Sequence, residues 1–180
     1  HIWRQDDLEW LKGPMVPRIF GPYEPIRRDY PICEYRADVE PMGIAKSVYV
    51  QTNWPPDRVV DEVRWVQTVA DETGWPHAIV GSADLMDDSC ATVFAEQARI
   101  SPLMRGTRLQ LHWHENPQYR FAPVPDRMND ATFRRNLARI ADYGWLFELQ
   151  VFAGQMADAA RLAADFPEIP FVLIHAGMLT

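Results

Sequence analysis

Short apolar runs alternate with amphipathic stretches through most of the chain. This alternation predicts strands starting at Ile44, His77, Met104, Leu146 and Phe171, with one helical pattern in each interval between them. Strands that alternate with helices in this way typically form a parallel sheet joined by right-handed crossovers. The expected fold class is therefore α/β.

The bounds of these elements follow from the apolar spacing and from turn residues. We expect strands at 44–50, 77–83, 104–111, 146–151 and 171–174, and helices at 57–73, 89–100, 130–143 and 156–165. Asp57 is a candidate N-cap for the first of these helices, and Gly74 is placed to end it. Asp84 is interpreted as a helix-capping or turn residue. The last strand, 171–174, is a continuous apolar run, which predicts burial on both faces.

Polar positions within the strands favour one of the two architectures that fit this alternation, a doubly wound sheet and a (β/α)8 barrel. Alternate positions place polar or small residues on one face of three strands: Ser47, Tyr49 and Gln51; Gly106, Arg108 and Gln110; Glu148 and Gln150. A barrel interior near its mouth accepts such side chains better than a strand between two helical layers. Since a whole barrel needs roughly 250 residues, this chain is expected to hold a partial barrel of five to six βα units.

Residues 1–43 lack this regularity. Prolines and aromatic residues are scattered through them without a period, which predicts a long loop packed over the core, with a short helix near 35–42. The expected organisation is one incomplete domain over residues 1–180, with 1–43 as a cover segment and 44–180 as regular βα units.

Composition and charge narrow the classes of function. The 180 residues are 47% hydrophobic and 12% aromatic, enough for one core, and the net charge of −7 is spread along the chain. We therefore expect a small-molecule substrate and no nucleic-acid or membrane partner, and we leave a homo-oligomer open. Cys33 and Cys90 match no metal or disulfide pattern, which favours reduced thiols and a cytoplasmic location. The chain opens on His1 rather than Met, so we expect a piece of a longer protein.

Candidate chemistry lies where strands end, because α/β folds place their sites at that edge of the sheet. His175 is the first polar residue after the last strand; its alternative interpretation is a capped histidine without a catalytic role. Arg108 would point inward and bind a substrate carboxylate or hydroxyl in bidentate fashion, or else pair with Glu148. Gln110 and Gln150 would orient the substrate or satisfy each other.

Other polar and aromatic residues of the loops are weaker candidates. Trp54 and Trp113 would form apolar pocket walls or pack the loops, and Gln51 ends the first strand near them. His112 and His114 have a spacing seen in metal ligands, but on a loop we interpret them as a surface pair.

A set of short motifs follows in order along nearly the whole chain. The motifs are His1-Ile-Trp3, Asn53-Trp-Pro-Pro56, Arg105-Gly-Thr-Arg108, Leu111-His-Trp113, Arg120-Phe-Ala-Pro123, Leu149-Gln-Val151 and His175-Ala-Gly177. Taken together, the set resembles the amidohydrolase-related TIM-barrel hydrolases, with the greatest similarity to the sugar-acid lactonases and pyrone-dicarboxylate lactonase of that superfamily.

The resemblance implies roles for the two histidines at opposite ends of the chain. His1 corresponds to the second histidine of the first-strand pair, and His175 to the histidine of a later strand, both as metal ligands or catalytic groups. The first histidine of the pair and an aspartate of the last strand would lie before His1 and after Thr180. Zinc is the first choice of metal, and a metal-independent mechanism stays open.

The expected activity is opening of a lactone by activated water. Two alternatives stay open: a metal-dependent decarboxylase of the same superfamily, and a truncated barrel fragment without catalytic activity. Position alone favours interpreting His1 as a disordered end or tag remnant, whereas the following Ile2-Trp3 and the resemblance favour a site residue.

Overall fold

A five-stranded parallel sheet forms the centre of the molecule, and strands adjacent in the sequence are adjacent in the sheet. The structure is a computed structural model and describes residues 1–178. The strands are β1 (Val48–Val50), β2 (Ala78–Gly81), β3 (Met104–Gln110), β4 (Leu146–Gln150) and β5 (Phe171–Leu173), paired in that order. A doubly wound sheet would reverse its order at a switch point. The sequential order confirms the predicted partial (β/α)8 barrel.

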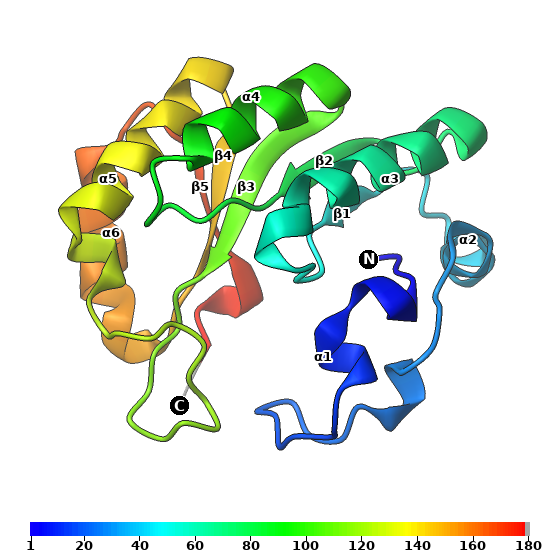
Figure 1. Ribbon diagram of the computed structural model, residues 1–180, viewed down its shortest axis with the longest axis horizontal. Coiled ribbons are helices and arrows are strands. Elements are labelled where there is room, and N and C mark those ends of the chain that lie inside the picture. The colour runs from blue at the N-terminus through cyan, green and yellow to red at the C-terminus, as the bar shows by residue number, and fades with distance from the viewer. Residues whose placement is uncertain (179–180) are drawn as a thin grey trace.

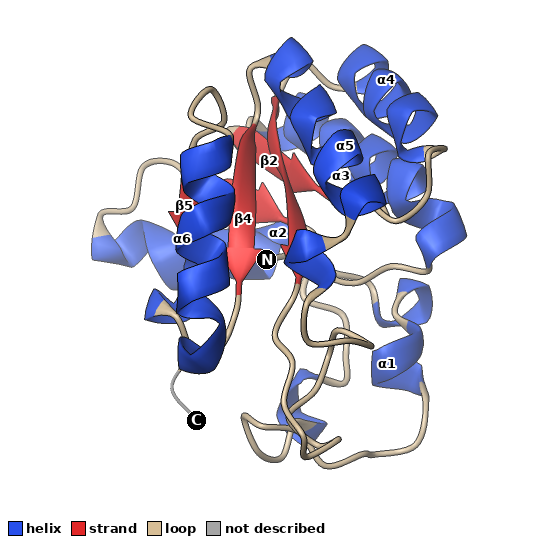
Figure 2. Ribbon diagram, turned by 90° about the vertical axis from the view of Figure 1, so that its left-hand side faces the viewer, coloured by secondary structure: helices blue, strands red, loops and turns tan. Residues whose placement is uncertain are grey.

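Four helices lie between successive strands and cover one face of the sheet (Figures 1 and 2). They are α3 (Val59–Thr73), α4 (Cys90–Ile100), α5 (Ala131–Ala138) and α6 (Met156–Asp165), preceded by α1 (Glu9–Lys12) and α2 (Ile32–Val39). The 3-10 turns are η1 (Gln5–Asp7), η2 (Glu24–Ile26), η3 (Glu40–Met42), η4 (Pro56–Arg58), η5 (Arg127–Asn129), η6 (Arg139–Tyr143), η7 (Ala153–Gln155) and η8 (Ile174–Ala176). No helix among residues 1–178 combines the length and the apolar character that crossing a membrane requires.

The ends of α3 show where local sequence signals were right and where they were wrong. Gly74 adopts a left-handed conformation (φ 75°) and ends the helix as predicted. Asp57 does not cap it, because Pro55 and Pro56 start the 3-10 turn η4 and leave Asp57 inside that turn. Asp84 is a turn residue, since its side chain accepts a hydrogen bond from the Met86 amide at 3.0 Å.

The face of the sheet that carries each side chain follows from the register. Phe147 packs on Phe133 of α5, with ring centroids 6.2 Å apart, so the next residue, Glu148, points to the face away from the helices. Arg108 is the register partner of Glu148 and shares that inner face. Gln110 and Gln150 are likewise partners two positions on. The predicted inward direction of these polar residues is therefore confirmed.

Tyr49 corrects the predicted face of β1. Its side chain is 3% exposed, belongs to the main core, and donates a hydrogen bond to Glu62 of α3 at 2.8 Å. It therefore lies on the helix-covered face, and Val48, 54% exposed, lies on the open inner face. The period-2 pattern was correct, but the apolar partners on α3 decide which set of alternate residues faces outward.

The prediction that the last strand is buried on both faces is wrong. Val172 and Leu173 of β5 are 39% and 38% exposed. The reason is that β5 pairs only with β4 and forms the edge of the described sheet, with Val172 opposite Glu148 on the open face.

Residues 1–43 pack through a second, smaller core. Its buried members are Leu8, Leu11, Tyr23 and Trp54, the last contributed by the loop after β1. Arg27 completes the C-terminal end of α1 by donating to the carbonyl oxygens of Leu11 (2.8 Å) and Gly13 (2.9 Å). The segment thus holds short helices around a core of its own, beside the sheet (Figure 1).

We predict that Gly106→Ala destabilises the fold. A methyl group at Gly106 would lie 2.6 Å from the carbonyl oxygen of Leu146, so β3 and β4 would have to separate. Overpacking of this kind costs about 1–3 kcal/mol of unfolding free energy. Gly154→Ala is the matched control, since no atom of the described part of the chain lies within 4 Å of its added methyl group. Urea unfolding of both variants measures the difference, and equal midpoints would contradict the close β3–β4 contact.

Candidate active site

The two histidines from opposite ends of the chain lie at the same edge of the sheet. His1 is held at the carboxyl end of β1, where its Nδ1 is 2.6 Å from the carbonyl oxygen of Val50. His175 lies in η8, immediately after β5. Because the strands are parallel, both positions belong to the carboxyl edge, and the N-terminus and η8 (red) lie on the open side of the sheet in Figure 1.

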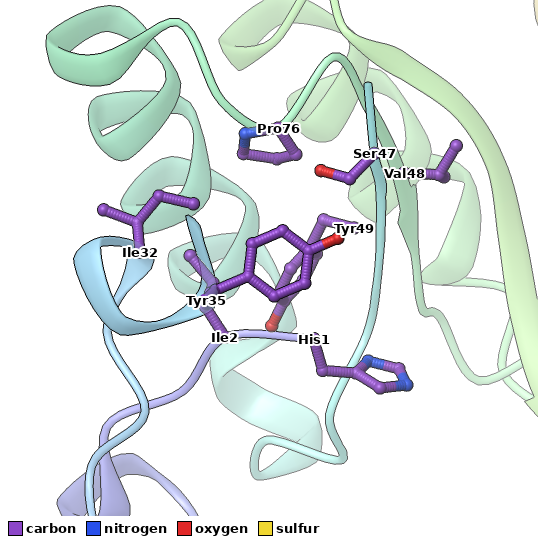
Figure 3. A pocket seen from close by; sticks show the side chains of 8 residues that line it. All are labelled: His1, Ile2, Ile32, Tyr35, Ser47, Val48, Tyr49 and Pro76. Atoms are coloured by element: carbon purple, nitrogen blue, oxygen red, sulfur yellow. The ribbon is translucent and has the colours of Figure 1, made fainter. Parts of the chain in front are cut away.

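The hydrogen bond of His1 fixes the tautomer of its ring. A carbonyl oxygen only accepts, so Nδ1 donates and Nε2 keeps its lone pair in the neutral imidazole. This is the arrangement that orients many catalytic and metal-binding histidines. His1 lines a small crevice beside β1 together with Tyr35 and Pro76, and Figure 3 shows its ring pointing away from those two side chains.

The backbone at His175 adopts an uncommon conformation. His175 and Ala176 have φ values of 53° and 54°, in the left-handed region that residues with a Cβ rarely occupy. Such conformations cost free energy and are often found at functional sites. His175 is exposed.

His112 differs from its predicted place on the surface. The ring is 7% exposed and lies between Phe121 and Phe152, at centroid distances of 5.6 and 5.3 Å. The loop folds back because the amides of Phe121 and Ala122 both donate to the carbonyl oxygen of His112 at 3.0 Å. Burial, and to a smaller extent the charge of His175, lower the pKa of His112 to about 4. His112 Nδ1 is buried and has no hydrogen-bond partner among residues 1–178.

Arg108 is 7% exposed, and its guanidinium donates a hydrogen bond to the backbone rather than to a carboxylate. One of its terminal nitrogens donates to the carbonyl oxygen of Gln51, across β2. No ion pair joins it to Glu148 in the described residues, so the predicted alternative of a buried pair is not what the structure shows. Burial lowers the pKa of Arg108, opposed by the charges of Glu148 and Glu62, and burial raises the pKa of Glu148 against the charge of Arg108.

The three predicted glutamines lie near this group. Gln51 is 2% exposed, and its side-chain oxygen accepts from the Asn53 amide at 2.6 Å. Gln150 is 8% exposed, and its amide donates to the sulfur of Met178 at 3.7 Å rather than to Gln110. Mutual satisfaction of Gln110 and Gln150 therefore does not explain their presence on the inner face.

The two tryptophans lie in different surroundings. Trp54 is 4% exposed, stacks on Trp65 at 6.0 Å, and is covered by Arg58 at 4.8 Å. It packs the second core, so we leave it out of the proposed site. Trp113 is half-buried in the loop after β3, with the Arg120 guanidinium 5.4 Å from its ring centre.

Sequence reasoning missed a buried polar cluster on the helix side of β1. Glu62 of α3 is 1% exposed and accepts hydrogen bonds from Tyr49 and Thr52. The sequence does contain a signal for this cluster: Glu62 is a carboxylate on the apolar stripe of α3, three residues after Val59 and one before Val63.

The donor set for a metal ion is incomplete within residues 1–178. Those residues include no group of three His, Cys, Asp or Glu side chains that could hold a metal, whereas a catalytic zinc site takes three protein ligands. His1 and His175 supply two imidazoles at the correct edge. These residues therefore do not by themselves fit a zinc site, and we derive no chemical step through a metal.

Sequence comparison identifies the family. The amidohydrolase profile matches residues 1–180, and the chain belongs to this family. It is 30% identical over 183 residues to the uncharacterized protein y4mH of Sinorhizobium fredii, a match that covers 99% of this chain and 60% of the relative. The chain thus spans about 60% of the length of this curated relative.

Three solved structures have a similar fold. An amidohydrolase from Burkholderia multivorans with bound zinc has a TM-score of 0.70 and 24% identity, over 86% of this chain and 50% of that one. The same protein with bound HEPES has a TM-score of 0.73 and 22% identity, over 98% of this chain and 55% of that one. A Pseudomonas putida protein with the provisional name 2-pyrone-4,6-dicarboxylic acid hydrolase has a TM-score of 0.60 and 22% identity, over 95% of this chain and 53% of that one. Each confirms the partial barrel.

We predict that His112 makes stability depend on pH between about 6.5 and 4. In the unfolded chain histidine titrates near 6.5, while in the fold the pKa of His112 is about 4. The unfolded state therefore binds the proton first, and stability falls as pH falls through this window, by about 3 kcal/mol in total.

Replacing His112 by glutamine should remove this contribution. Urea unfolding at pH 7 and pH 4.5 measures it, with the wild type as reference. A variant that keeps the full slope of the wild type would show that His112 is not buried in its neutral form.

Proposed function

We propose that the complete enzyme hydrolyses the lactone of a small, polar acid. The observation that carries the proposal is that His1, beside the end of β1, and His175, after β5, both lie at the carboxyl edge of an amidohydrolase-family barrel whose inner face carries Arg108. The Pseudomonas neighbour, named for a dicarboxylic acid hydrolase, supports a lactone that bears a carboxylate. The substrate would be a free small molecule, and a cytoplasmic location belongs to the same proposal.

The proposed chemistry needs a base, a carbonyl-polarising group and a charge that holds the acid. Water adds to the lactone carbonyl, the ring C–O bond breaks, and the released alkoxide takes up a proton, giving a hydroxy acid. Nε2 of His1, which keeps a lone pair when the imidazole is neutral, would take the proton from water, and His175 lies at the same edge of the sheet. The remaining donors of Arg108 would bind the carboxylate of the substrate, with Gln51, Gln110, Gln150 and Trp113 around it.

A divalent metal, zinc first, is part of this proposal in a limited form. The zinc-bound Burkholderia neighbour and the two imidazoles at the edge support it. When bound, the metal would lower the pKa of water and polarise the carbonyl. In that metal-bound form His1 and His175 would serve as ligands, together with groups from the rest of the complete protein, and Nε2 of His1 would then not act as the base.

We expect Arg108→Lys to lower kcat/KM for carboxylate-bearing lactones by about 10- to 100-fold. Lysine keeps the charge but loses the fork geometry, and a hydrogen bond to a charged group is worth about 1.5–3 kcal/mol. Arg105→Lys is the matched control on the same strand, because Arg105 is exposed and bonds only the nearby carbonyls of Pro102 and Met104. An equal loss in both variants would argue against substrate binding by Arg108.

The reaction class is tested with the enzyme produced from its complete gene. We expect aldonolactones or pyrone dicarboxylate to be opened without release of carbon dioxide. Carbon dioxide released from aromatic carboxylates would instead establish the decarboxylase alternative.

We expect His175→Gln to lower kcat at least about 100-fold, as loss of a group that acts in proton transfer does. If zinc is bound, its content per protein, measured by elemental analysis, should also fall. His114→Gln is the control, since His114 is half-buried and its Nδ1 accepts from the Asn116 amide within its own loop. Unchanged kcat and zinc content in the His175 variant would remove this residue from the site.

A further inference from the structure

The first three of the five residues between β1 and η4, Gln51–Asn53, are held by several hydrogen bonds. The amide of Gln51 donates to the carbonyl oxygen of Val80 on β2 at 2.9 Å. The amide of Asn53 donates to the side chain of Gln51 at 2.6 Å, and Asn53 is held in a left-handed conformation at φ 64°. We call Gln51–Asn53 the β1 segment.

Three side chains from distant parts of the chain bind three further backbone groups of the β1 segment. Arg108 of β3 donates to the carbonyl oxygen of Gln51. Trp10 of α1 donates to the carbonyl oxygen of Thr52 at 3.0 Å. Glu62 of α3 accepts from the amide of Thr52 at 2.7 Å. Together they fix a segment that has no sheet partner on its other side.

Glu62 makes the largest set of these contacts. One of its oxygens, Oε1, accepts from the Tyr49 hydroxyl at 2.8 Å, the Thr52 amide at 2.7 Å and the Thr52 hydroxyl at 3.1 Å. All three donors are neutral, while the carboxylate is 1% exposed. Burial raises the pKa of Glu62, and the hydrogen bonds from Thr52 and Tyr49 and the charge of Arg108 oppose that rise.

A carboxylate at this position is costly for the helix that carries it. The neighbouring positions on the same stripe of α3 are Val59, Val63 and Val66, all buried. An apolar residue would avoid the desolvation of a buried charge. The contacts of Glu62 therefore indicate that it holds the conformation of the β1 segment. That segment directly follows Val50, whose carbonyl oxygen orients the ring of His1.

We propose that Glu62 is a positioning residue of the active site. By holding Thr52 through its amide and hydroxyl, it fixes the β1 segment against Arg108, and so fixes both the carbonyl that orients His1 and the side chain of Gln51. Glu62 does not touch the substrate. The inference rests on the proposed hydrolase function, although the clamp itself can be measured without catalysis.

The test uses Glu62→Gln in the enzyme produced from its complete gene. Hydrogen exchange of the peptide that contains the β1 segment should become at least tenfold faster, because a neutral amide oxygen accepts more weakly than a carboxylate. With a lactone that the wild type opens, kcat should fall at least tenfold while KM changes less than threefold.

Two controls separate positioning from a general loss of stability. Glu72→Gln makes the same chemical change at an exposed position of the same helix, and should alter neither quantity. Val66→Ala removes buried volume from the same stripe of α3 but none of the hydrogen bonds to the β1 segment, and should lower the melting temperature without the fall in kcat. A fall in kcat for Val66→Ala as large as for Glu62→Gln, at a similar melting temperature, would overturn the proposal.

Thr52→Val extends the test if Glu62→Gln does not fold. This variant removes the hydroxyl contacts and keeps the backbone hydrogen bond to Glu62. Hydrogen exchange should therefore quicken and kcat should fall, each by a smaller factor than in Glu62→Gln. Unchanged exchange in the β1 segment of Glu62→Gln or Thr52→Val would refute the clamp. If exchange quickens but the wild type opens no lactone, the hydrolase proposal fails while the clamp stands.

Discussion

Parallel pairing of five strands in sequence order is the constraint on which the rest of this structure depends. It directs every carboxyl end to one edge and every following helix to one face. As a result His1 beside β1, the loop after β3 and His175 after β5 share an edge, although they come from opposite ends of the chain. The chemistry is distributed in the sequence and gathered only by this topology.

The two faces of the sheet have opposite characters for a physical reason. The outer face packs on α3 to α6 through side chains such as Phe94, Phe133 and Phe147, all fully buried. The inner face carries Arg108 and Glu148, where a charge can remain partly solvated or bind a substrate. A charged side chain is costly to bury between the sheet and the helices. Glu62 is buried there, and its hydrogen bonds to Tyr49 and Thr52 explain its position.

Local signals were sufficient for most of the fold. Apolar runs and helical spacing located the five strands and the helices α3 to α6, since those patterns report which residues face a common core. Gly74 ended α3 because a left-handed residue is needed there. The predicted N-cap at Asp57 was wrong, because Pro55 and Pro56 start a 3-10 turn that contains Asp57.

The sequence by itself determined the alternation of elements, the polar tips of the strands and the motifs shared with the amidohydrolases. Tertiary structure alone decided that Tyr49 faces the helices, that His112 is buried between two phenylalanines, and that Arg108 bonds the Gln51 carbonyl. Strand periodicity fixes that neighbours point to opposite faces, but not which face is covered. That choice, and the partner of each buried polar group, depends on contacts between residues far apart in the chain.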